Sequence, residues 1–490
     1  MRLGMRLKFA LGSSVSLTAL MVAAPAVASA AASSGNVPCT QAALVGAINA
    51  ANAAGGGTIN LTQGCDYALT SVDNGGNGLP VVTTRIGVNG NGATIAGNNT
   101  SFRVFEVDGP GGNLSLQNVT ITGGSADIGG GIENVGGTLT LNRSQVTGNT
   151  ASQAGGGIAS GTFDPSSVAR LTLNSSQVTG NSQTVGPQDN GLGGGGIVNL
   201  LGTMTLNSST VNANSAMGFV GGGIANGDYM NFSSSSSFLT LNNSQVNGNT
   251  APNAGGGGIQ NLLGSVTLNN SQVNRNTSLN GGGISSGNGN GGIPPGTSHL
   301  VLNKTQVDGN TATAPVPQPG SQGGPPIAAG GIANGGDAVL NSSEVNFNTA
   351  THTSGAGIVN HGSMTLNKSE VNGNTAAGSG VVASGGGIIN AQGPPGAAAS
   401  AILVLNNSQV SNNRAGGDGG GIANGVPLGG PMPLIGGPVT LNHSQVTGNT
   451  AVHGGGIFNF GGTVTLAKTS VTGNNPDNCE PPGSITGCVG

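Results

Sequence analysis

Tryptophan is absent from this 490-residue sequence, tyrosine occurs twice, and charged residues make up only 6% of the chain. An ordinary soluble domain has about 25% charged residues. The net charge of −4 and the lack of a basic run disfavour nucleic-acid binding, because Lys and Arg provide most phosphate contacts. Glycine is abundant, with 96 residues. Each Gly inside a helix costs about 1 kcal/mol relative to Ala, so long helices are excluded.

The first thirty residues have the features of a secretory signal peptide. Three basic residues occur among the first eight, residues 9–27 are apolar, and Ala28-Ser29-Ala30 fits the A-x-A cleavage pattern. We expect cleavage after Ala30; an uncleaved membrane anchor is the alternative. No later run of 18 apolar residues offers a transmembrane helix. The sequence therefore predicts a secreted, extracellular or cell-surface protein.

The four cysteines lie near the two ends of the predicted mature chain, where export would allow them to form disulfides. Proximity favours Cys39–Cys65 and Cys479–Cys488 among the three possible connectivities. A bond that closes a loop of about 26 residues should stabilise the fold by roughly 3 kcal/mol. Neither a Cys-x-x-Cys motif nor a histidine cluster supports zinc, and we expect no metal and no cofactor.

From residue 129 onward one unit recurs eleven times. Its first motif is Gly-Gly-Gly-Ile or a close variant, followed two residues later by Asn in nine units. Its second motif reads L-T-L-N-x-S-x-V-x-x-N, as in Leu139–Asn149. The last Asn of this motif occurs in every unit, as Asn149, Asn181, Asn214, Asn249, Asn276, Asn310, Asn348, Asn374, Asn413, Asn449 and Asn474.

A period of about 25 residues with three short apolar stretches is typical of one triangular coil of a parallel β-helix. Leu139 and Leu141 alternate with threonines, which predicts a strand with one buried face. Ile132 and Val146 would supply the inward residues of the other two stretches. Stacked coils place equivalent residues about 4.8 Å apart, so the invariant Asn should form a ladder of side-chain amides. The position of Asn243, which varies among units, should point to water and accept any residue.

The segment before the clear units predicts weaker coils and a cap. Three degenerate coils are expected around residues 58–61, 88–95 and 114–121. Helical spacing of Leu44, Val45, Ile48 and Ala51 predicts a helix that begins after Thr40, its N-cap, and ends at Gly55. The fold class is therefore all-β, a right-handed parallel β-helix of about 11 clear and 3 degenerate coils with an N-terminal capping helix. The predicted organisation is a signal peptide (1–30), a cap with an amphipathic helix (31–57), the parallel β-helix (58–475) and a Pro-rich disulfide tail (476–490).

The GGGI and V-x-x-N motifs resemble the paired GGA(I/L/V) and F-x-x-N motifs of polymorphic outer-membrane protein repeats. More broadly, residues 58–475 are similar to secreted bacterial right-handed β-helix repeat proteins of the pectin-lyase-like group. The resemblance implies the β-helix fold and an adhesin-like role at the cell surface. Polymorphic membrane proteins depend on a C-terminal autotransporter barrel, for which we find no sequence after the last repeat, so attachment by that route is not expected.

The same resemblance implies how an enzyme of this kind would work. Pectin-lyase-like enzymes act on acidic polysaccharides, but the polygalacturonase motifs N-T-D, D-D, G-H-G and R-I-K are absent. Weak catalytic candidates are Glu344 and Glu370, at equivalent positions of consecutive units, with His361 and Lys368 on the same stretch. Stacking would place the two carboxylates about 5 Å apart, near the spacing of a retaining glycosidase pair. The alternative is that both glutamates replace Gln in an exposed ladder and Lys368 offsets their charge.

Insertions offer a second place for function, because loops on a rigid scaffold commonly carry it. Five of them leave from one corner, at residues 159–170, 225–238, 285–299, 389–402 and 423–438, and contain Phe163, Tyr229, Phe232 and Met432; another, at 312–328, leaves from a second corner. The shortage of aromatic residues argues against a strong sugar-stacking site.

Our first hypothesis is a non-catalytic, adhesin-like or structural protein. It would be a monomer that contacts a polysaccharide or the cell-envelope surface. The alternative is a polysaccharide lyase or glycoside hydrolase with a site near Glu344 and Glu370. The sequence leaves open whether the protein is an enzyme.

Overall fold

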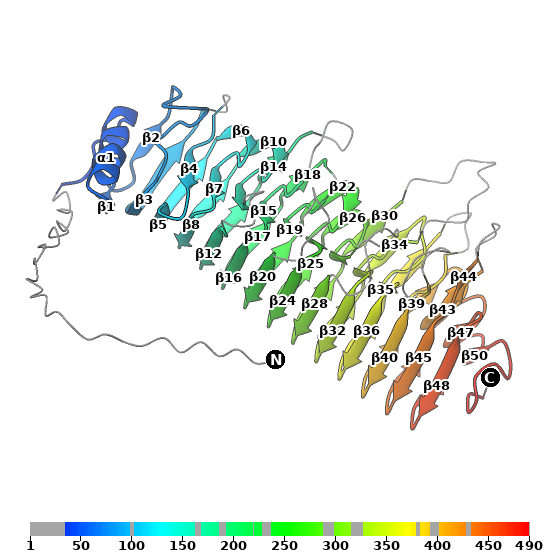
Figure 1. Cartoon of the computed structure of the whole chain (residues 1–490). Helices are drawn as coiled ribbons and strands as arrows, with labels where there is room; N and C mark the ends of the chain where they lie inside the picture. Colours follow the sequence, from blue (N-terminus) through cyan, green and yellow to red (C-terminus); the bar gives the residue numbers. More distant parts are fainter. Residues whose placement is uncertain are drawn as a thin grey trace, which may run out of the picture.

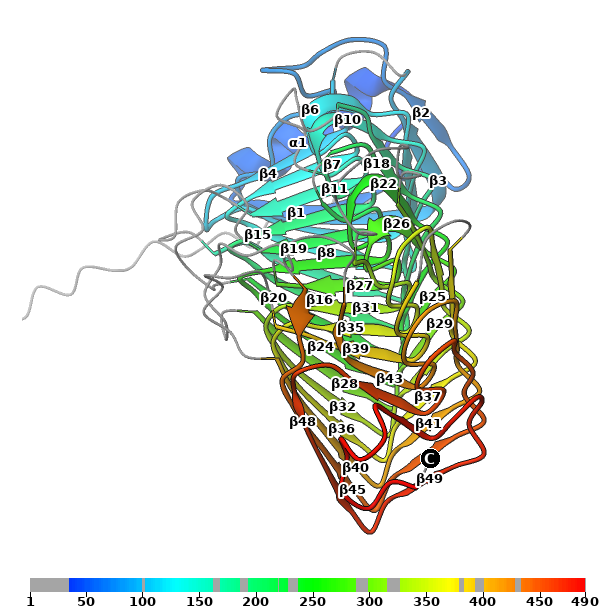
Figure 2. The same ribbon diagram turned by 90° about the vertical axis from the view of Figure 1, so that its right-hand side faces the viewer.

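A computed structural model of the chain shows a long rod in which short β-strands stack along one axis (Figures 1 and 2). The structure describes residues 35–98, 102–161, 168–185, 193–218, 220–227, 237–287, 298–314, 327–378, 383–392, 401–427 and 433–489. The predicted signal peptide lies outside these residues. Strands of successive coils pair in parallel and in register, which confirms the parallel β-helix.

The largest sheet has 26 strands and receives two strands from each clear coil. In the first strand, Leu139 and Leu141 are fully buried, while Thr138, Thr140 and Asn142 alternate on the outer face. The first strands of the clear coils are β8 (Thr138–Asn142), β12 (Arg170–Asn174), β16 (Thr203–Asn207), β20 (Phe238–Asn242), β24 (Ser265–Asn269), β28 (His299–Asn303), β32 (Asp337–Asn341), β36 (Ser363–Asn367), β40 (Ile402–Asn406), β45 (Pro438–Asn442) and β48 (Thr463–Ala467). The second strands are β9 (Gln145–Thr147), β13 (Gln177–Thr179), β17 (Thr210–Asn212), β21 (Gln245–Asn247), β25 (Gln272–Asn274), β29 (Gln306–Asp308), β33 (Glu344–Asn346), β37 (Glu370–Asn372), β41 (Gln409–Ser411), β46 (Gln445–Thr447) and β49 (Ser470–Thr472).

The 14-stranded sheet contains the strand that follows the Gly run of each clear coil, together with β4, β44 and β50. A Cβ added at Gly131 would lie 2.7 Å from the carbonyl oxygen of Gly157 and 3.0 Å from the amide carbon of Asn149. Glycine is therefore required where neighbouring coils approach each other and the Asn ladder. These strands are β4 (Phe105–Asp108), β7 (Ile132–Val135), β11 (Ile158–Gly161), β15 (Ile197–Leu200), β19 (Ile224–Gly227), β23 (Ile259–Leu262), β27 (Ile284–Ser286), β31 (Ile332–Asn334), β35 (Ile358–Asn360), β39 (Ile388–Asn390), β43 (Ile422–Val426), β47 (Ile457–Asn459) and β50 (Cys479–Glu480), with β44 (Leu434–Ile435) antiparallel to β43.

The 10-stranded sheet, which was not predicted, contains β6 and the strand that follows the ladder Asn in nine of the clear coils. Val146 points inward and is fully buried, as predicted, and its strand β9 lies in the 26-stranded sheet. The third wall is built instead from short segments whose small residues, such as Ala151, gave no apolar signal. These strands are β6 (Ser125–Ile128), β10 (Thr150–Ala154), β14 (Ser182–Gln183), β18 (Ser215–Ala216), β22 (Thr250–Gly255), β26 (Thr277–Asn280), β30 (Thr311–Thr313), β34 (Thr349–Thr351), β38 (Thr375–Ala377) and β42 (Arg414–Ala415).

The corner between the two strands of each coil corrects a prediction. Asn243 points to water as expected, but its φ is 50°, in the left-handed region. The equivalent residue of all eleven coils also has a positive φ, from Arg143 (49°) to Lys468 (51°). This backbone disfavours most side chains by about 1–2 kcal/mol, and Asn tolerates it better than most. The position is therefore exposed but not free of constraint.

Both ends of the rod are covered, as Figure 1 shows for the N-terminal helix. Helix α1 (Gln41–Ala53) begins after Thr40, whose hydroxyl accepts a hydrogen bond from the Ala43 N–H at 3.2 Å. Its Leu44 and Ile48 are fully buried in the same core as the coil interiors. Three further coils follow, made by β1 (Gly56–Asn60) with β2 (Asp66–Ala68), by β3 (Arg85–Ala96) and by β5 (Asn113–Thr122). The helix and the three weaker coils are therefore confirmed.

Both expected disulfides are present, Cys39–Cys65 beside α1 and Cys479–Cys488 in the tail. Among the described residues, no helix is both long and apolar enough to cross a bilayer.

Candidate functional site

The invariant Asn residues form the predicted ladder along the rod. In each step, the side-chain oxygen of one Asn accepts hydrogen bonds from the backbone N–H and the amide group of the Asn one coil earlier. Asn276 Oδ1, for example, lies 2.9 Å from both Asn249 nitrogens. The amide group of Asn276 also donates to the carbonyl of Val246 at 2.9 Å. At the C-terminal end, Asn478 of the tail takes the place of the next coil and accepts from Asn474. From Asn149 to Asn449 the ladder residues are buried structural groups that a ligand cannot reach, whereas Asn474 at the C-terminal end is only partly buried.

The Asn of each L-N-x-S motif forms a second, half-exposed ladder. Asn303, for example, donates to Asn269 at 2.9 Å, and Asn269 donates to Asn242 at the same distance. The following Ser residues are buried, and Ser144 donates to the carbonyl of Leu116. The repeated N-x-S/T pattern is therefore explained by coil geometry.

Glu344 and Glu370 are direct neighbours in the 26-stranded sheet, as their spacing predicted. Glu344 continues a row of glutamine side chains: Gln272 donates to Gln306 at 3.2 Å, and Gln306 donates to Glu344 at 3.3 Å. Asn346 also approaches the same carboxylate oxygen, at 3.5 Å. Glu370 is exposed. On its other side Glu370 pairs with Gln409, so the two glutamates interrupt an outward-facing row of glutamines.

His361 and Lys368 do not form one cluster with this pair of glutamates. Lys368 lies at the exposed corner between β36 and β37, whereas His361 lies beyond the other end of β36. Five strand residues separate that end from the corner, about 16 Å at the usual rise. The ring nitrogen Nδ1 of His361 lies 2.8 Å from the carbonyl of Ala391, and burial lowers the pKa of the imidazole. His361 is thus a packed corner residue.

A hollow of about 440 Å³ lies on the second strands of the central coils. The surrounding region, which we call the central patch, consists of Asn247, Gln272, Asn274, Arg275, Asp308, Gly309 and Phe347, which line the hollow, and of Glu344 and Glu370 beside them. Arg275 and Phe347 occupy the position before the ladder Asn, which is Gly in seven of the eleven units. Both have a φ of 56°, and the Phe347 side chain is 64% exposed. Two large side chains therefore project from a corner that is built for glycine.

The floor of the hollow is an ordered row of Asn and Asp side chains. Asn274 Oδ1 accepts from the backbone N–H of Asp308 at 3.0 Å, and Asp308 Oδ1 accepts from that of Asn346 at 3.0 Å. The same contact links Asn247 to Asn274 and Asn346 to Asn372. Burial raises the pKa of Asp308 to about 6, and the nearby Glu344 carboxylate acts in the same direction. Asp308 therefore titrates close to neutral pH.

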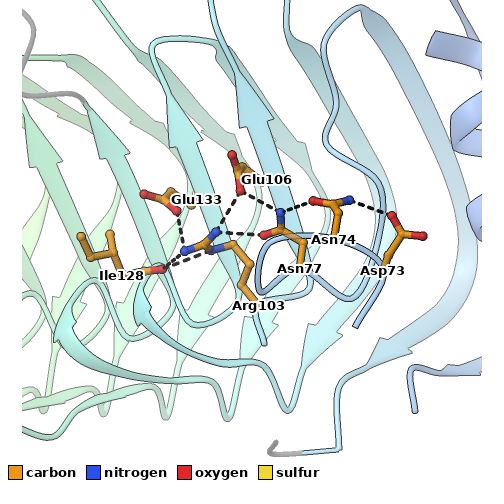
Figure 3. A network of polar contacts seen from close by, with 7 residues as sticks. All are labelled: Asp73, Asn74, Asn77, Arg103, Glu106, Ile128 and Glu133. Carbon is orange, nitrogen blue, oxygen red and sulfur yellow. Dashed lines mark hydrogen bonds and ion pairs between the residues drawn. The ribbon is translucent and has the colours of Figure 1, made fainter. Parts of the chain in front are cut away.

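A second polar cluster lies near the N-terminal end (Figure 3). The Arg103 guanidinium bridges two glutamates on adjacent strands, at 2.9 Å from Glu106 and 2.7 Å from Glu133. The buried side chain of Asn77 joins the same group through Glu106 at 2.8 Å and Arg103 at 2.9 Å. Burial raises the pKa of Glu133, although Arg103 opposes the shift. The cluster ties the segment before β3 to the 14-stranded sheet, so its evident role is structural.

Of the central patch, only Glu344 and Glu370 were singled out from the sequence, and the seven residues that line the hollow were missed. Three of them, Arg275, Asp308 and Phe347, depart from the repeat. Their signal was present: Arg and Phe replace Gly before the ladder Asn, and Asp replaces Asn or Thr one position earlier. Aromatic residues are scarce, as the sequence shows, but Phe347 is one that lies exposed beside the hollow. The loop residues Phe163, Tyr229, Phe232 and Met432 lie outside the described residues.

The described residues contain no group of three or more His, Cys, Asp or Glu side chains that could hold a metal ion. Comparison of the chain with protein-family models, with curated proteins and with solved structures found no match.

Proposed function

We propose that this protein is a secreted or cell-surface β-helix repeat protein that binds an extended polysaccharide on its central patch without catalysis. In this proposal residues 1–30 direct export, and the capped rod presents the patch to an extracellular or cell-envelope surface. The resemblance to pectin-lyase-like and polymorphic outer-membrane repeats supports an adhesin-like role.

The observation that carries the proposal is the ordered row of Asn and Asp side chains beneath the hollow. Backbone N–H groups fix the side-chain oxygens of Asn247, Asn274 and Asp308, so these groups are already ordered before a ligand arrives. A preorganised row loses less conformational entropy on binding than free side chains would. Because the row repeats at about 4.8 Å along the rod, it suits a ligand that is itself extended and rich in hydroxyl groups.

Binding is tested with the mature protein and immobilised polysaccharides of neutral, acidic and cationic type. We expect at least one to bind, and the double variant Arg275→Gly/Phe347→Gly to lose at least about tenfold in affinity, as is usual for central interface residues. Glycine is the usual residue of this corner, so the variant should keep its fold. The matched control is Arg170→Thr/Phe238→Thr, which removes the same two residue types from exposed positions that hold Thr in other coils. Equal loss in both variants, or no loss in either, would contradict the proposal.

The alternative function, a polysaccharide lyase or glycoside hydrolase, is favoured by geometry: Glu344 and Glu370 are paired on adjacent strands, next to the hollow that Asp308 lines. The raised pKa of Asp308, about 6, would allow this carboxyl group to exchange protons near neutral pH beside Glu344. Release of reducing ends or unsaturated sugars from any polymer of the panel, abolished by Asp308→Asn or Glu344→Gln, would establish catalysis. The non-catalytic proposal predicts no such release.

A further inference from the structure

We propose that the hollow over Gly309 is a subsite for one neutral pyranose ring, whose apolar face lies against Phe347 while its hydroxyls bind Arg275 and the amide row. The inference rests on the proposed polysaccharide binding and specifies its ligand. It is carried by three observations: the placement of Phe347, the polar groups opposite it, and the local charge.

Phe347 has a conformation that its own coil does not require. Its φ of 56° is one that β-carbon-bearing residues adopt at a cost of about 1–2 kcal/mol, and seven of the eleven coils place Gly there. The ring lies across the next corner, since a Cβ added at Gly373 would be 2.7 Å from its Cε1 atom. Backbone strain of this kind is commonly found at functional sites, and here it occurs at a residue whose aromatic ring is exposed.

The opposite wall and the floor are polar. Arg275 lies two coils before Phe347, about 10 Å away at the strand spacing, and its stem leans over Gly309, whose added Cβ would be 3.8 Å from Arg275 Cγ. The side chains of Gln272 and Asn274, from the coil of Arg275, and of Asp308, from the coil between, also line the hollow. Amide groups both donate and accept hydrogen bonds, as sugar hydroxyls do. A volume of about 440 Å³ is at the lower end of the range for small-molecule sites, which suits a ring rather than a longer segment.

The charge of the region selects against an acidic sugar. Within the hollow, the positive charge of Arg275 offsets the negative charge that Asp308 carries above its pKa of about 6. The neighbouring coils then add the carboxylates of Glu344 and Glu370. Like charges about 4 Å apart repel by about 1 kcal/mol even in water, so successive uronate groups along a chain would be disfavoured. A neutral pyranose avoids this repulsion and still uses every polar group of the hollow.

The test uses soluble hexasaccharides as probes: laminarihexaose, maltohexaose and mannohexaose as neutral chains, hexagalacturonate as an acidic chain, and a chitosan hexamer as a cationic chain. Calorimetry measures affinity, and saturation-transfer NMR measures which sugar protons contact the protein. We expect a neutral hexasaccharide to bind most tightly, with saturation strongest on protons of one ring face. Phe347→Gly should weaken that binding by about threefold to tenfold, the range for one aromatic contact. Phe347→Tyr should retain it, and Phe238→Thr should leave it unchanged.

Two kinds of failure are distinguishable. If hexagalacturonate or the chitosan hexamer binds more tightly than every neutral chain, or if Phe347→Gly has no effect on a bound neutral chain, the pyranose subsite is wrong while polysaccharide binding stands. If no polymer or hexasaccharide binds the wild-type protein, the proposed function itself fails. A thermal melt of Phe347→Gly that is no lower than wild type shows that a loss of binding is not a loss of folding.

Discussion

Replacement of Asn276 by Leu should destabilise the centre of the rod strongly. Asn276 Oδ1 accepts from the backbone N–H and from the amide group of Asn249, both at 2.9 Å, within a fully buried ladder. Leucine removes this acceptor and leaves two buried donors of Asn249 without it. Each buried group left unsatisfied costs about 1–3 kcal/mol, so the expected loss is about 2–6 kcal/mol. Crowding adds to it, because a Cβ at Gly258 would already lie 2.8 Å from Asn276 Nδ2.

The matched control is Asn269→Leu, which makes the same change in the same coil. Asn269 donates to Asn242 and accepts from Asn303, but this ladder is half-exposed and water can replace the lost partners. We expect a cost within about 0.5 kcal/mol.

Native-state hydrogen exchange is the suitable assay, because coils contact only their neighbours and damage should stay local. In Asn276→Leu, amides of the coils around residues 249–310 should exchange faster than amides at either end, and the thermal melt should divide into two transitions. Equal destabilisation by the two variants would show that the invariant Asn is not a buried ladder and would refute the reasoning.

Three further predictions concern other parts of the rod. Arg103→Met should lower the free energy of unfolding of the N-terminal coils by about 2 kcal/mol, as measured by urea denaturation. This is less than the roughly 3–5 kcal/mol for breaking a fully buried pair, because Glu106 and Glu133 remain partly exposed. An unchanged denaturation midpoint would contradict the structural role of the cluster. Asn243→Leu should cost about 1–2 kcal/mol while Asn243→Gly costs little, because φ is 50° there; equal melting temperatures would contradict the backbone assignment. The pKa of Asp308 is raised from 3.8 to about 6, so its protonation stabilises the fold fully below pH 3.8, and this stabilisation is lost as the pH rises through 6. Asp308→Asn should remove that part of the pH dependence of stability. An unaltered stability–pH curve in the variant would contradict the raised pKa.

Much of the fold could be predicted from the sequence because the same two motifs recur in eleven units. The alternating Leu-Thr pattern, the Gly run and the invariant Asn each recur in register, so one correct interpretation of Leu139–Asn149 predicts the strands and the ladder for the whole rod. The capping helix followed from the spacing of Leu44 and Ile48, which are fully buried.

Other features had no such signal. The 10-stranded sheet is built from small or polar residues, such as Thr150 and Ala151, which carry no hydrophobic pattern. The left-handed corner at Asn243 holds Arg, Lys or His in other coils, so the variation of this position suggested that any residue fits there. The central patch is distinguished by residues that depart from the repeat. Phe347 and Asp308 each occur in one unit only, so the recurring pattern gave no reason to single them out.

The most direct test of polysaccharide binding on the central patch is hydroxyl-radical footprinting of two exposed phenylalanines, with and without the tightest-binding polymer. Phe347 and Phe238 are 64% and 49% exposed, so both should be oxidised readily in the free protein. If the ligand lies on the central patch, it should protect Phe347 and leave Phe238 as reactive as before. Protection of Phe238 with no change at Phe347 would place the ligand elsewhere on the rod and contradict the account.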